Sequence, residues 1–135
     1  MTPILLLKLA ALAHLGLIAA GLLMPARTRL WAHLADLPPF IRNLFRVYYL
    51  FIGLCLVSFG AASWFLAEEL AAGTLLARAT CGFLAAFWML RLVAALSIFD
   101  VRPYLTNAWL RVGYQATNVV FAALPPLYAW LALRA

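Results

Sequence analysis

Five side chains of this sequence combine a chemically useful group with a position inside an apolar run. They are His14, Tyr49, Arg91, Gln115 and Asn118. Arg91 is the strongest candidate for a binding site, because an arginine inside a membrane is costly and normally finds a partner or an aqueous path. Together, these donors would suit an anionic headgroup or a quinone carbonyl. They permit a ligand pocket. The alternative that we favour is that Arg91 reaches the cytoplasmic surface, toward Asp100 or a lipid phosphate, and that Gln115 and Asn118 only fasten helices together.

The depth of these residues along their helices decides whether they can meet. With a rise of about 1.5 Å per residue, Arg91 lies roughly 7 Å to the cytoplasmic side of the middle of its span. Gln115 and Tyr49 come to a similar level, while Asn118 and His14 lie nearer the midplane. We therefore expect a polar cluster in the inner leaflet, with His14 above it.

His14 suggests a separate hypothesis, because a histidine can carry a proton or bind haem or copper. A haem held by two histidines would need a second one at similar depth, and His33 lies in a connection between spans. We expect His14 instead to be an interior residue that is held by a hydrogen bond.

Cys55 and Cys81 differ in depth by about 7 to 8 Å, so a disulfide bond between them is not expected. No metal site is predicted, and no cofactor is identified.

Catalytic groups in familiar arrangements do not occur in the sequence. It has no nucleotide-binding loop, no HExxH motif and no CxxC pair, and Glu68 and Glu69 are adjacent residues at a helix end. The sequence therefore leans away from an enzyme without excluding one.

The elements that must position these residues are long apolar runs. Of the 135 residues, 68% are hydrophobic and 10% are charged, and the mean hydropathy is +1.02. An average soluble domain is about half apolar and about a quarter charged. Runs near the roughly 20 residues that cross a hydrocarbon core cover about 3–24, 44–66, 74–98 and 108–133. We predict a single membrane domain over residues 1–135, an all-α four-helix bundle.

The long connection between the first two spans carries its own pattern. Within "RTRLWAHLADLPPF" (27–40), the apolar residues fall near one helical face, which is typical of a short helix lying in the membrane interface. An ordinary polar loop is the alternative. Pro38 and Pro39 should end this helix and turn the chain into the second span.

Small residues at helical spacing predict which faces meet inside the bundle, because membrane helices approach closely where side chains are small. In the first span they lie on the same stripe as His14, which should point inward. Gly53 and Gly60 mark the second span, and Ala77 and Cys81 mark the third. In the fourth span, Gln115 and Asn118 share one side with Arg111, which we expect near the headgroups.

The distribution of cations predicts the orientation in the membrane. With four spans, the first and third connections share one side, and both termini share the other side with the second connection. The first side and its margins hold Arg27, Arg29, Arg42, Arg46, Arg102 and Arg111. The other side holds Lys8, Arg78 and Arg134, together with Glu68 and Glu69. Because Lys and Arg near span ends favour the cytoplasm, both termini are predicted on the non-cytoplasmic side.

Three stretches resemble a group of small uncharacterised bacterial membrane proteins with four predicted spans. They are "LPPFIRNLFRVYYLFIGL" (37–54), "CGFLAAFWMLRLV" (81–93) and "FDVRPYLTNAWLRVGYQ" (99–115). The resemblance covers most of the chain from the second span onward. It implies a multi-pass protein of the bacterial cytoplasmic (inner) membrane, without implying an activity or a role for any residue.

These observations leave three functional hypotheses. The leading one is a non-enzymatic scaffold or accessory subunit, whose partners are the lipid bilayer and another membrane protein or further copies of this chain. The alternative is a binder or carrier of a lipid, a quinone or another small molecule in the inner-leaflet pocket. A third is haem or copper binding through His14. Nucleic acid is not an expected partner despite the net charge of +6, because the cations sit at the ends of apolar runs.

Overall fold

The computed structural model describes residues 2–98 and 106–134, and these residues form helices without any strand. Four helices are long and apolar enough to cross a membrane: α1 (Pro3–Thr28), α3 (Pro39–Phe65), α5 (Leu75–Ser97) and α6 (Ala108–Leu133). Two short helices, α2 (Leu30–Ala35) and α4 (Ala67–Ala71), lie in the connections. The predicted all-α fold with four apolar spans is therefore confirmed, and the short helix between the first two spans is present.

Local sequence signals explain where these helices begin. The side chains of Thr2, Thr74 and Asn107 each accept a hydrogen bond from the backbone N–H three residues further on, at 3.2, 3.1 and 2.9 Å. Such caps satisfy donors that a helix start leaves unpaired. Pro39 is the first residue of α3, where its missing N–H costs nothing.

The ends of α1 and α3 extend beyond the predicted spans. α1 continues through Pro25 to Thr28, and α3 begins at Pro39 instead of near residue 44. α1 stops at Arg29, which has a left-handed backbone (φ 53°), a common way for a helix to end. Gly73 also has a positive φ, of 76°, between α4 and α5.

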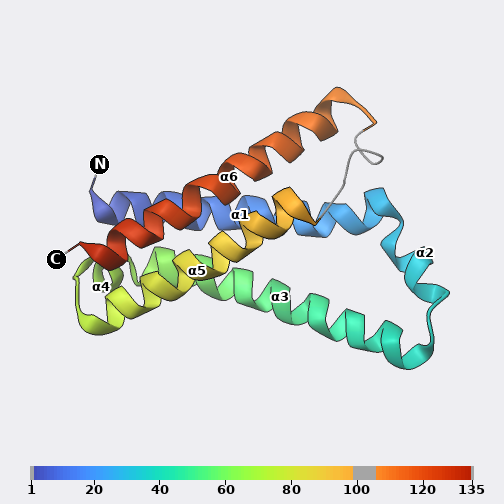
Figure 1. Ribbon diagram of the computed structural model, residues 1–135, viewed down its shortest axis with the longest axis horizontal. Helices are drawn as coiled ribbons and strands as arrows, with labels where there is room; N and C mark the ends of the chain where they lie inside the picture. Colours follow the sequence, from blue (N-terminus) through green and yellow to red (C-terminus); the bar gives the residue numbers. More distant parts are fainter. Residues whose placement is uncertain (1, 99–105, 135) are drawn as a thin grey trace.

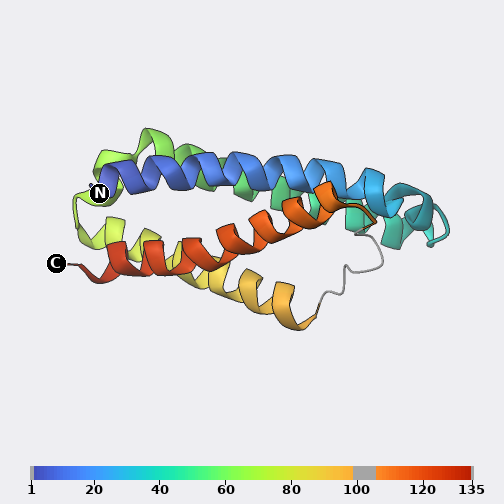
Figure 2. The same cartoon turned by 90° about the horizontal axis from the view of Figure 1, so that it is seen from above.

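The four long helices form two pairs. α1 packs along α3, and α5 packs along α6, while α1 also contacts α6 and α4. Both termini and α4 lie at one end of the molecule, and α2 lies at the other (Figure 1). Figure 2 shows the same arrangement from above. In both views α5 and α6 diverge from each other toward the α2 end, and Figure 1 shows α3 separating from α1 in the same direction.

We call the two parts of the bundle the closed half and the open half. The closed half comprises residues 3–17, 58–71, 75–88 and 121–133, and the open half comprises the remaining described residues of the same helices with α2. Nearly all buried side chains lie in the closed half: Leu7, Ala10, Ala11, His14, Leu17, Ser63, Ala67, Leu70, Ala77, Cys81, Leu84, Trp88, Phe121, Leu124, Pro125, Tyr128 and Leu131. Within the described part of the open half, only Pro25, Leu34 and Ala95 are buried.

The arrangement places the connections as four antiparallel spans require. Both termini share an end with the α3–α4–α5 connection, and most arginines of the described residues belong to the α2 end (Figure 1). Arg102, which contributed to the predicted orientation, and Asp100, a predicted partner of Arg91, lie outside the described residues. The side of the membrane that each end faces remains a prediction.

Candidate functional site

The structure divides the five predicted site residues among three places. Tyr49 belongs to the contact between α3 and α1 in the open half, and His14 lies in the closed half. Arg91 and Asn118 lie on the α5–α6 pair, and Gln115 is an exposed residue of α6. The contacts described for Tyr49 and His14 are therefore with residues outside the expected cluster, and a shared inner-leaflet site stays a prediction.

Tyr49 bridges two helices through a hydrogen bond from its hydroxyl to the backbone carbonyl of Gly21. This carbonyl lies four residues before Pro25, which has no N–H to offer it. A carbonyl that a proline leaves free inside a membrane needs another donor. Trp31 packs edge-on against the Tyr49 ring, with 5.6 Å between ring centroids, and holds it in place. Tyr49 thus supplies the donor that Pro25 lacks and links α3 to α1.

Arg91 and Asn118 come from facing helices of the α5–α6 pair. The guanidinium carbon of Arg91 lies 5.5 Å from the centroid of the Phe121 ring, a cation–π distance. Asn118 precedes Phe121 by about one helical turn, and its side-chain oxygen is buried without a hydrogen-bond partner among the described residues. Arg91 and Asn118 thus both lie near Phe121, and the Asn118 side-chain oxygen is an acceptor without a hydrogen bond among the described residues.

His14 is fully buried at the centre of the closed half. Its Nδ1–H donates to the carbonyl of Ala10 at 2.7 Å, so Nε2 carries the lone pair and has no partner among the described residues. The ring meets Trp88 at 5.1 Å, and Phe59 and Tyr128 at 6.4 Å each, all nearly edge-on. The predicted inward orientation is confirmed, and the ring is part of an aromatic core.

The aromatic packing around His14 does not provide the space that a haem would need at Nε2, because three rings already surround the imidazole. The described residues also include no group of three or more His, Cys, Asp or Glu side chains that could hold a metal ion. Cys55 and Cys81 are both free, the first exposed and the second buried.

Of the two glycines predicted to face the inside of the bundle from the second span, only Gly60 makes a close contact. A Cβ at Gly60 would lie 3.1 Å from the Cβ of His14, so the missing side chain lets α3 approach α1. The same expectation for Gly53 is wrong, since no atom would lie within 4 Å of a Cβ there. Equal spacing along a helix does not reveal where its neighbour comes close.

One buried polar contact was not predicted. The hydroxyl groups of Ser63 on α3 and Tyr128 on α6 lie 2.6 Å apart, and both residues are fully buried. This hydrogen bond joins the two helix pairs inside the closed half. The signal that could have found it is the position of Ser63 one turn after Gly60, on a face already expected to be inside.

The comparisons with known proteins add no assignment: no protein-family model, curated protein or solved structure matches this chain. The resemblance to small four-span bacterial proteins stays a prediction.

Proposed function

We propose that this protein is a non-enzymatic subunit of a membrane assembly, in which a helix of another membrane protein or of a second copy packs against the open half. The observation that carries the proposal is the inner seam of α3, defined as Phe45, Ile52, Leu56, Phe59 and Ser63. These residues lie three, four or seven positions apart and therefore share one helical face, to which Tyr49 also belongs.

Burial along this seam is greatest in the closed half. Ser63 is fully buried and Leu56 and Phe59 are half-buried, whereas Ile52 is 58% and Phe45 40% exposed. The seam is thus a packed core face in the closed half and is partly exposed in the open half, where Tyr49 on the same face contacts α1. Ser63 is the only fully buried residue of α3. The exposed part of this face could pack against a further helix in the open half.

Polar side chains in the open half support a protein neighbour over lipid tails, which offer no hydrogen bonds. Gln115 is exposed on an apolar span, and the side-chain oxygen of Asn118 has no partner among the described residues. In membranes, Asn and Gln side chains typically bond across helix interfaces. A partner helix would give the exposed Gln115 amide the contacts that lipid cannot.

The proposal includes a place and an orientation. We propose a bacterial cytoplasmic membrane, with the arginine-rich α2 end at the cytoplasmic surface and both termini outside, since cations near span ends favour the cytoplasm. The partner would then pack within the inner leaflet.

Native mass spectrometry of the assembly, purified gently from its own membranes, tests the proposal. We expect masses above that of one chain, containing a second copy or another membrane protein. Ile52→Trp should reduce the associated fraction, because it alters the exposed part of the seam. The matched variant Leu54→Trp should not, because Leu54 is equally exposed, at 57%, but lies on the opposite side of α3. A strictly monomeric chain from native membranes would contradict the proposal.

A second candidate, binding of a lipid, a quinone or another small molecule, draws on Arg91 of α5, which lies over the Phe121 ring, and on Asn118, one turn before Phe121 on α6. The guanidinium suits an anionic group, and the unsatisfied amide oxygen suits a ligand donor. The same mass spectra would reveal a retained molecule of defined mass. If Arg91→Gln and Asn118→Leu leave the content of that molecule unchanged, these two residues do not bind it.

A further inference from the structure

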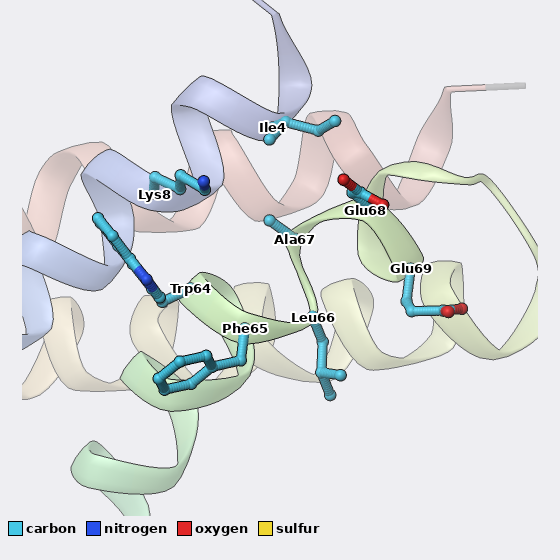
Figure 3. Close-up of a pocket in the computed structure, with 8 residues that line it drawn as sticks. All are labelled: Ile4, Lys8, Trp64, Phe65, Leu66, Ala67, Glu68 and Glu69. Atoms are coloured by element: carbon cyan, nitrogen blue, oxygen red, sulfur yellow. The ribbon is translucent and has the colours of Figure 1, made fainter.

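A pocket of about 370 Å³ lies at the end of the bundle opposite α2, outside the open half. It is formed where the first turns of α1 meet the junction of α3 and α4 (Figure 3). The residues that line it are Ile4, Lys8, Trp64, Phe65, Leu66, Ala67, Glu68 and Glu69. None of these residues has a role in the site described above.

The pocket holds charges of both signs. Lys8 is half-buried, and its amine lies 5.2 Å from the centroid of the Trp64 ring. Glu68 is exposed in the first turn of α4. Figure 3 shows the Lys8 amine and the Glu68 carboxylate on two sides of the pocket, with Ile4 and Ala67 between them. Positive and negative groups are thus held apart on separate helices.

We propose that this pocket binds the headgroup of a zwitterionic phospholipid that carries a primary amine. Its phosphate would pair with the Lys8 ammonium, and its amine would pair with the Glu68 carboxylate, each as a charge-assisted hydrogen bond. A headgroup with only negative charge would gain from Lys8 but be repelled by Glu68 and Glu69. A purely cationic ligand would be attracted by Glu68 and Glu69 but repelled by Lys8.

The surroundings favour a primary amine over a trimethylated one. A carboxylate accepts hydrogen bonds, which a primary ammonium donates and a trimethylammonium group does not. Trimethylammonium groups are instead held by the faces of aromatic rings, and the Trp64 ring already interacts with Lys8.

The position of the pocket favours a lipid over a free zwitterion. It lies near the ends of two helices apolar enough to cross a membrane, α1 and α3, and Trp64 is of the residue type enriched at membrane–water interfaces. Ile4 and Phe65 supply apolar surface beside the charges, which would contact the acyl chains.

Lipid retention by the full-length protein tests the site. The purified chain would be mixed with equal amounts of ethanolamine, choline and glycerol phospholipids of identical acyl chains, and bound lipid would be counted by native mass spectrometry. We expect the ethanolamine lipid to be retained in excess over both others. Lys8→Gln and Glu68→Gln should each reduce that excess by about two- to fivefold, the range of partly exposed ion pairs.

Arg134→Gln is the matched control, because Arg134 also lies over a tryptophan, 5.3 Å from the Trp130 ring centroid, but does not line the pocket. It should leave the lipid preference unchanged. Lys8→Arg should retain the preference if charge is what matters, and it also guards against misfolding of Lys8→Gln. Equal retention of all three lipids, or a Lys8-dependent preference for the glycerol lipid, would overturn the proposal. Displacement by free phosphoethanolamine at the lipid's own concentration would assign the pocket to a soluble zwitterion instead.

Discussion

The closed and open halves of this bundle use the same kinds of residues but pack them differently. In the closed half, Trp88 is 2% exposed and contacts His14, Phe87 and Phe121. In the open half, Trp109 is 86% exposed. Because lipid provides no hydrophobic force between helices, stability in a membrane depends on close packing and internal hydrogen bonds. The closed half should therefore hold the isolated chain together, leaving the open half available for association.

Replacing one tryptophan in each half should give the largest difference between the two halves in the change of unfolding free energy. Trp88→Ala would open a cavity among α1, α5 and α6 and should lower the free energy of unfolding by about 3 to 5 kcal/mol. Trp109→Ala should change it by less than about 0.5 kcal/mol, as for a surface site. Reversible unfolding in mixed detergent micelles would measure both. Comparable losses would show that the two halves do not differ in this way.

The two glycines of α3 provide a smaller contrast with identical chemistry. Gly60→Ala forces a methyl group against the Cβ of His14, whereas Gly53→Ala meets no atom within 4 Å. We expect the Gly60 variant to be less stable than the Gly53 variant by about 1 to 3 kcal/mol, the usual cost of overpacking. Thermal unfolding in one detergent would rank them. A Gly53 variant as unstable as the Gly60 variant would place a close helix contact where the structure has none.

The buried hydroxyl pair should contribute less than either packing change. Tyr128→Phe removes the hydrogen bond to Ser63 while keeping the ring, and it should cost about 0.6 to 1.7 kcal/mol. Tyr48→Phe is the matched control, because Tyr48 is exposed. Adding Ser63→Ala to Tyr128→Phe should cost less than Ser63→Ala alone, which a double-mutant cycle would show. Additive losses would indicate that the two hydroxyl groups do not interact.

The smallest expected effect is at the bond that ties α3 to α1 in the open half. Tyr49→Phe should cost about 0.6 kcal/mol, a typical value for an interhelical hydrogen bond in a membrane. Pro25→Ala should abolish that cost, because residue 25 would then donate its own N–H to the Gly21 carbonyl. Unfolding free energies of both single variants and the double variant would measure this. A Tyr49→Phe loss that is unchanged beside Pro25→Ala would show that Tyr49 does not replace the missing donor.

Much of the fold followed from the sequence, because each membrane span needs a long apolar run whatever its neighbours are. The short helix before Pro38 and the inward orientation of His14 also followed from local patterns. The contacts of the individual site residues could not be predicted, since depth along a helix does not say which helices pair. Tyr49 shares a predicted level with Arg91, but it bonds α1 whereas Arg91 contacts α6.

Photo-crosslinking in native membranes tests the association of the open half most directly. A photoreactive residue at Ile52 would sample the exposed part of the α3 seam, and one at Leu54 would sample the opposite side of the same helix at nearly the same depth and exposure. We predict covalent adducts with a second protein chain from position 52, and adducts with lipid alone from position 54. Lipid adducts alone from both positions would contradict the claim that another helix completes the bundle.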